Sequence, residues 1–199
     1  MKIVSFPDFG CGGIVCTLLN KEPLVFYHLG HVESPGHFLL KEYSHQAAFN
    51  RIRFAELIFQ HKDFAGWVGT HCHPIDFVDI DEVDQVLYIR GESVESKCLL
   101  ALRQLEFTDG LADPRMVETL LGQRWFWPNR WQQKVEHPKV TNVDLYDFYS
   151  SRDCRQALGE IDESVFAQWL AKNDYMPYMQ TALGVWDEMT TRPHEYMTV

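Results

Sequence analysis

The chain lacks long apolar runs and has few basic residues. No hydrophobic stretch reaches the roughly 18–20 residues that a membrane-spanning helix requires, and the amino terminus has no basic region followed by a signal-type apolar core. We therefore expect a cytoplasmic protein with no membrane partner. Basic residues number 18 against 28 acidic ones. This acidic balance disfavours nucleic acid as a partner, because nonspecific binding to it depends on neutralising phosphates.

Paired cysteines and internal repeats are also missing. The five cysteines are odd in number and show no C-x-x-C spacing, so they predict reduced, mostly buried thiols and exclude a disulfide framework. A length of 199 residues with 46% hydrophobic residues suits one domain with a sizeable core. We expect a single domain over 1–199, with a mainly helical portion from about 150 to 199.

The start of the chain combines a short apolar run with a cluster of glycines. Ile3 to Phe6 predicts a buried strand that Pro7 ends, and a helical pattern follows over Ile14 to Leu19. Between them lie Gly10, Gly12 and Gly13. A strand, a glycine turn and a helix together point backbone N–H groups at an anion. The alternative is a tight turn that needs glycine only for packing.

Further strands and helices are expected to alternate along the chain. The strands are expected at Leu24–Leu29, Gly66–His71, Gln85–Arg90 and Lys139–Leu145, and the helices at about 46–61, 94–107, 113–122, 152–158 and 163–172. Ser93 is a candidate N-cap, and Pro114 begins the helix near 113. This order predicts an α/β fold with a mostly parallel sheet.

Polar residues follow several of these strands. Ligands of parallel sheets bind outside the carboxyl ends of the strands. The glycine turn, the segment His71–His73, and Arg90 with Ser93 all follow predicted strands, so we expect them to converge on one crevice. Each has a plainer alternative: His71 bonded to backbone, Arg90 paired with Glu92 or Glu95, and Asp8 capping the turn.

Three segments, taken together, resemble the sulfotransferase family. Ser5-Phe6-Pro7-Asp8-Phe9-Gly10-Cys11-Gly12 is similar to its phosphosulfate-binding loop, and Gly69-Thr70-His71-Cys72-His73-Pro74 to its K-T-H-x-P segment. The stretch from Val86 to Ser96 resembles a strand that ends in arginine and leads into a helix with an early serine. A later strand, Lys139 to Leu145, lies where that family has another strand.

The resemblance implies a three-layer α/β/α fold of the P-loop type and a sulfuryl-transfer reaction. A sulfuryl group would pass from the cofactor 3′-phosphoadenosine 5′-phosphosulfate to a small hydroxyl or amine acceptor, with His71 as the catalytic base. Arg90, Ser93 and Ser96 would hold the 3′-phosphate. The transferred group would be held by the loop residues, which are Asp8, Phe9, Gly10, Cys11, Gly12 and Gly13.

Other functions are kept as alternatives. Asp8 stands where that family has a cation and Cys98 where it has a serine, which favours a non-catalytic binding or structural module. A P-loop-type phosphotransferase is a further alternative, although no G-K-S/T follows the glycines. His71 and His73 could share a metal on one face of an extended chain. No H-E-x-x-H or C-x-x-C pattern supports such a centre, so we expect no metal.

Overall fold

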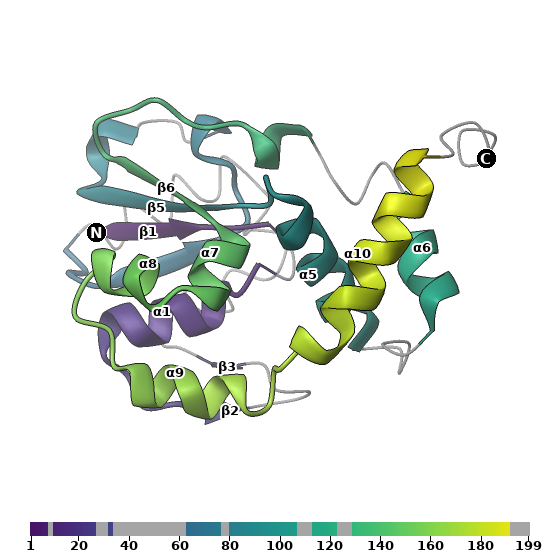
Figure 1. Ribbon diagram of the computed structural model, residues 1–199. Helices are drawn as coiled ribbons and strands as arrows, with labels where there is room; N and C mark the ends of the chain where they lie inside the picture. The colour runs from purple at the N-terminus through teal and green to yellow at the C-terminus, as the bar shows by residue number, and fades with distance from the viewer. Residues whose placement is uncertain are drawn as a thin grey trace.

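A four-stranded parallel sheet forms the centre of the structure. The computed structural model describes residues 1–7, 10–26, 32–33, 63–76, 80–106, 113–122 and 129–191. Its sheet has the order β4 (Trp67–Thr70), β1 (Lys2–Ser5), β5 (Gln85–Arg90) and β6 (Val140–Asp144), and every neighbouring pair is parallel (Figure 1). The predicted α/β class with a mostly parallel sheet is therefore confirmed.

The two faces of the sheet bury different sets of side chains. Leu87 and Ile89 of β5 point into the larger core, whereas Val86 points into a smaller one with Ile3 and Val68, as the two-residue period of a strand requires. The larger core is completed by the helices α1 (Gly12–Asn20), α5 (Val94–Leu105), α7 (Leu145–Ser150) and α9 (Glu163–Leu170). Figure 1 shows α1, α7 and α8 (Arg152–Ala157) on the same side of the sheet.

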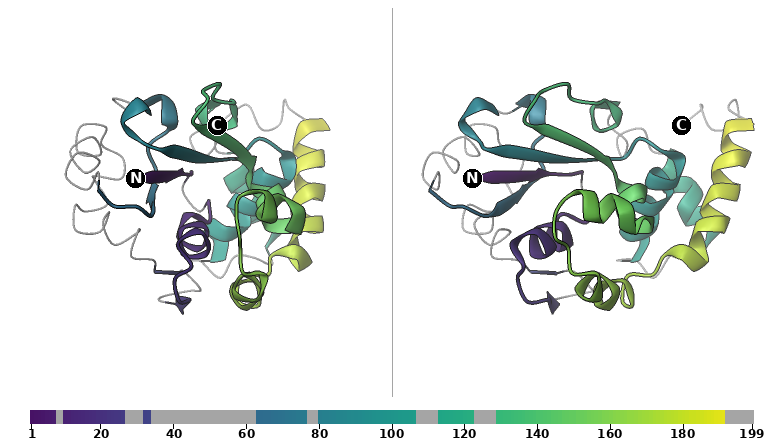
Figure 2. Two further views of the ribbon diagram at one scale, coloured as in Figure 1. Left: turned by 90° about the vertical axis from the view of Figure 1, so that its left-hand side faces the viewer. Right: turned by 60° about the vertical axis from the view of Figure 1, so that its left-hand side comes forward.

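Two further helices extend the structure beyond the carboxyl ends of the strands. Helix α10 (Met176–Thr191) packs along α5 and α6 (Pro114–Gly122), as Figure 2 shows. Pro114 begins α6 as expected. Helix α10 lies within the portion from about 150 to 199 that was expected to be mainly helical, although its bounds were not predicted. Helix α7 was not predicted, because it has only six residues. The short 3-10 helices η2 (Pro74–Asp76), η3 (Ile80–Glu82) and η6 (Asn129–Gln132) connect the strands.

The second predicted strand does not join the central sheet. β2 (Val25–Phe26) pairs antiparallel with β3 (Val32–Glu33) as a separate two-stranded sheet. Val25 is 49% exposed, so the apolar run around it does not reflect a buried position in the central sheet. The helix expected at 46–61 lies outside the described residues, as do Asp8 and Phe9.

The described residues bear on the state of the cysteines and on the presence of membrane-spanning helices. All five cysteines are free thiols and four of them are buried, as expected. Within the described ranges, no helix is both long enough and apolar enough to cross a membrane.

Candidate functional site

The carboxyl ends of β4, β1 and β5 lie side by side at one edge of the sheet. Ser5 of β1 is in register with Thr70 of β4 and with Tyr88 of β5. The chain leaves β1 toward β4 on one side, and leaves β5 toward β6 on the other. Adjacent strands whose connections diverge in this way mark the place where α/β sheets bind ligands. The segments after the three strands are therefore neighbours at a favourable position.

His71 is fixed against the segment that follows β1. The Phe6 N–H donates to Thr70 O at 3.0 Å, and the Ser5 hydroxyl donates to Cys72 O at 2.7 Å. Nδ1 of His71, which is half-buried, lies 3.2 Å from Phe6 O, and the two rings pack edge to face with centroids 4.5 Å apart. A carbonyl can only accept, so this hydrogen bond places the proton on Nδ1 and, in the neutral ring, the lone pair on Nε2.

The glycine turn between β1 and α1 is tightly folded. The Gly10 N–H donates to Pro7 O at 2.9 Å, and a Cβ at Gly10 would lie only 2.6 Å from the same oxygen. Cys11 then takes a left-handed backbone conformation (φ 62°, ψ 15°) as the N-cap of α1, where a residue other than glycine is strained. No side chain of the described residues caps this helix. Gly12 and Gly13 form its first two positions.

Gly12 leaves room for the ring of Phe6. A Cβ at Gly12 would lie 2.0 Å from carbon atoms of that ring, which is far inside van der Waals contact. Phe6 therefore touches both His71 and the first residue of α1. Packing accounts for this glycine, as the plainer alternative proposed, and the same packing brings His71 next to the start of the helix.

Cys11 carries a buried thiol close to a buried cation. Cys11 is 4% exposed and Arg103 of α5 is 6% exposed. Burial raises the pKa of the Cys11 thiol above its ordinary value, and the charge of Arg103 opposes this only in part. The Arg103 guanidinium lies over the rings of Trp169 and Tyr175, at 5.5 and 5.6 Å from their centroids. Arg103 thus brings positive charge close to Cys11 at the amino end of α1. No pattern in the sequence had identified Arg103 as a site residue.

Arg90, the last residue of β5, is buried and already paired. Its Nη1 donates to Gln132 O at 3.2 Å and forms an ion pair with Glu92. This is one of the two salt bridges that the sequence offered as the plainer alternative. Its Nε is buried and has no hydrogen-bond partner among the residues that the structure describes. An incoming anion at Arg90 would meet a guanidinium whose charge Glu92 largely balances.

Ser93 and Ser96 surround an internal carboxylate. Ser93 is the N-cap of α5, as predicted, and its hydroxyl accepts from Ser96 N at 3.0 Å. Asp144, at the end of β6, accepts from Glu92 N at 3.1 Å, from Ser93 N at 3.0 Å and from the Ser93 hydroxyl at 2.7 Å. The Ser96 hydroxyl donates to it as well. The amino end of α5 therefore already holds a negative charge, supplied by the protein.

The candidate residues fall into two groups at the same edge. The first contains the glycine turn and His71, which meet through Phe6. The second contains Arg90, Ser93 and Asp144, which line a cavity of about 530 Å³ with Lys134, and Ser96, which joins them by its bond to Asp144. Asp144 was missed in the sequence. Its position before a helix could have revealed an N-cap, but not its contact with α5.

His73 is a core residue in this structure. It is 3% exposed and packs edge-on against Tyr88 and Trp131, with centroids 4.9 and 5.4 Å away. Its Nδ1 accepts from Ile75 N at 3.2 Å. Among the described residues, no group of three or more His, Cys, Asp or Glu side chains is arranged to hold a metal ion.

Comparisons with known proteins give no relative for this chain: no family model, no curated protein and no solved structure matches it.

Proposed function

We propose that the protein is a divergent sulfotransferase-like enzyme. It transfers a sulfuryl group from a donor of the 3′-phosphoadenosine 5′-phosphosulfate type to a small hydroxyl or amine acceptor. The observation that carries the proposal is the position of His71, whose ring touches Phe6 at the entrance to the glycine turn. The finer fold assignment, a three-layer P-loop-type domain, belongs to the same proposal and is supported by the glycine turn between β1 and α1.

In this proposal each group has one role. Nε2 of His71 takes the proton of the acceptor as the acceptor oxygen or nitrogen attacks sulfur. The bond between sulfur and the phosphate oxygen of the donor breaks, and 3′-phosphoadenosine 5′-phosphate leaves. The N–H groups in the first turn of α1 and the dipole of that helix stabilise the charge on the transferred group. Arg90 attracts the second phosphate.

A second candidate, a non-catalytic binding or structural module, is favoured by the neighbouring helix. Asp144 takes the hydrogen bonds of Ser93 and Ser96, and Glu92 balances Arg90. A donor phosphate at this place would have to compete with both carboxylates. Such a protein would keep the fold and the structural role of these residues without catalysing transfer.

Calorimetric titration with 3′-phosphoadenosine 5′-phosphate separates the two candidates. For an enzyme we expect binding that Arg90→Ala weakens by about tenfold or more. His71→Ala should retain binding and lose turnover. Arg115→Ala, which changes an exposed arginine on α6, should leave binding unchanged. Absence of both heat and thermal shift at millimolar ligand would refute the enzyme and favour the module. Binding of ATP–Mg²⁺ alone would instead favour a phosphotransferase.

A further inference from the structure

Arg90 presents a buried positive charge to a cavity at the carboxyl edge of the sheet. The cavity has a volume of about 530 Å³, and Arg90, Glu92 and Glu95 are among the residues that line it. This volume is in the range of small-molecule sites. The side chain of Arg90 is 6% exposed, and a charge so far from water requires a partner of opposite sign. In this structure that partner is Glu92.

The Glu92 carboxylate satisfies only part of the Arg90 guanidinium. Nη1 of Arg90 donates to Gln132 O at 3.2 Å, which fixes the direction of the side chain, and Oε2 of Glu92 pairs with the same nitrogen. Nε has no hydrogen-bond partner within the described ranges. An anion that engages arginine fully makes two parallel hydrogen bonds to it. Glu92 is therefore a weaker partner than a bidentate anion would be.

The side chain of Glu92 can leave Arg90 without disturbing the fold. It is 50% exposed, and exposed side chains change rotamer in picoseconds to nanoseconds. Its backbone is held independently, because the Glu92 N–H donates to Asp144 at 3.1 Å and the Gly91 N–H donates to Trp131 O at 3.1 Å. Asp144 itself is buried and accepts hydrogen bonds at both oxygens. Of these two carboxylates, Glu92 is the one that an incoming anion can displace.

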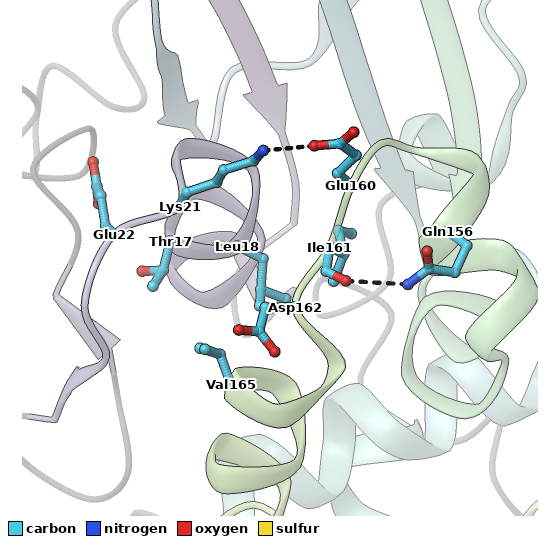
Figure 3. Close-up of a pocket in the computed structure, with 9 residues that line it drawn as sticks. All are labelled: Thr17, Leu18, Lys21, Glu22, Gln156, Glu160, Ile161, Asp162 and Val165. Atoms are coloured by element: carbon cyan, nitrogen blue, oxygen red, sulfur yellow. Dashed lines mark hydrogen bonds and ion pairs between the residues drawn. The ribbon is translucent and has the colours of Figure 1, made fainter.

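An ion pair elsewhere in the molecule differs from this one in its exposure to water. Lys21 and Glu160 pair at 2.8 Å beside a second cavity, of about 410 Å³, near the end of α1 (Figure 3). Their side chains are 67% and 90% exposed, so water solvates both charges and the pair contributes little. Arg90 is shielded from water, and an anion in the cavity beside it gains more from its charge.

We propose that Glu92 is an autoinhibitory latch on the anion site at Arg90. When the second phosphate of the donor enters the cavity, the Glu92 side chain rotates into solvent and the phosphate takes its place on the guanidinium. This inference rests on the proposed function, in which Arg90 attracts that phosphate. The latch raises the apparent Kd for the donor in inverse proportion to the fraction of molecules in which Glu92 has left Arg90.

Calorimetric titration of the full chain with 3′-phosphoadenosine 5′-phosphate at pH 7 tests the latch. Glu92→Gln keeps the size of the side chain and removes its charge, and it should tighten binding by about fivefold or more. The matched control is Glu95→Gln, which removes an equal charge from the same cavity but leaves the ion pair between Arg90 and Glu92 intact. It should change binding by less than about twofold. In the Arg90→Ala background, Glu92→Gln should have no effect.

Three results would overturn the latch. The first is that Glu92→Gln binds the ligand no more tightly than the unaltered chain. The second is that Glu95→Gln tightens binding as much, which would show a general effect of charge in the cavity. The third is that the gain from Glu92→Gln persists in the Arg90→Ala background. If Arg90→Ala fails to fold, the comparison of Glu92→Gln with Glu95→Gln decides.

Inorganic pyrophosphate, titrated into the same proteins, separates the latch from the transferase. Suppose that 3′-phosphoadenosine 5′-phosphate binds neither the unaltered chain nor Glu92→Gln. If pyrophosphate then binds Glu92→Gln at least about fivefold more tightly than the unaltered chain, the latch stands and the transferase fails; any other result with pyrophosphate refutes both. If 3′-phosphoadenosine 5′-phosphate binds the unaltered chain and Glu92→Gln does not improve this binding, the latch fails and the transferase stands.

Discussion

Helices α1 and α5 both begin at the carboxyl edge of the sheet, but their first turns are satisfied differently. At α5, Ser93 caps the helix in an extended conformation (φ −69°, ψ 158°), and the carboxylate of Asp144 accepts from the N–H and the hydroxyl of this cap residue. At α1, the N-cap is the buried Cys11 in a left-handed conformation, and no described residue supplies a side-chain cap. An external anion therefore has a stronger electrostatic reason to bind at α1 than at α5.

The largest expected effect comes from removing the internal anion of α5. Asp144→Ala removes the acceptor of both the Ser93 and the Ser96 hydroxyl and of the N–H groups of Glu92 and Ser93, in a partly buried place. We expect the free energy of unfolding to fall by about 3–4 kcal/mol, measured by urea denaturation. The control is Asp162→Ala, which removes an exposed N-cap of α9 and should cost about 1 kcal/mol. Equal losses in the two variants would show that Asp144 is only a cap.

A second large effect is expected at the start of α1. Gly12→Ala places a Cβ 2.0 Å from the ring of Phe6, and we expect a loss of about 2–3 kcal/mol in unfolding free energy. Gly184→Ala in α10 adds a Cβ with nothing within 4 Å, and should be neutral or stabilising by up to about 1 kcal/mol. A double-mutant cycle with Phe6→Ala tests the cause. The penalty at Gly12 should shrink once the ring is gone.

A smaller effect is expected from the side-chain cap of α5. Ser93→Ala removes the acceptor for Ser96 N but leaves Asp144 bonded to the Ser93 N–H. The expected loss is about 1 kcal/mol in unfolding free energy. Ser150→Ala is the matched control, because its exposed hydroxyl donates only to Tyr146 O within its own helix. If Ser93→Ala cost as much as Asp144→Ala, the hydroxyl and not the carboxylate would hold this end of α5.

The smallest effect concerns the alkylation of Cys11, which we expect not to take place in the native protein. A cysteine at the amino end of a helix usually has a lowered pKa and reacts readily. At Cys11, burial raises the pKa of the thiol, so the thiolate is scarcer at pH 8 than in a free cysteine. Iodoacetamide should leave Cys11 of the native protein unlabelled in mass spectrometry, whereas the urea-unfolded chain should be labelled at all five cysteines. Rapid native labelling at Cys11 would mean that its thiol is accessible and that burial does not raise its pKa.

The sequence by itself determined the elements whose signals are local. The strand Gln85–Arg90, the cap at Ser93 and the start of α6 at Pro114 were all predicted at their observed positions. Each depends on residues within a few positions of one another: an apolar run, a hydroxyl before a helix, or a proline that suits the first helical turn. The parallel arrangement followed from the alternation of these elements.

Other features were decided by tertiary structure. Asp144 contacts Ser96 across 48 residues of chain, and Phe6 contacts His71 across 65. Such contacts depend on which strands become neighbours and how their ends pack, so no local pattern specifies them. The same reason explains why β2 pairs with β3 instead of joining the central sheet.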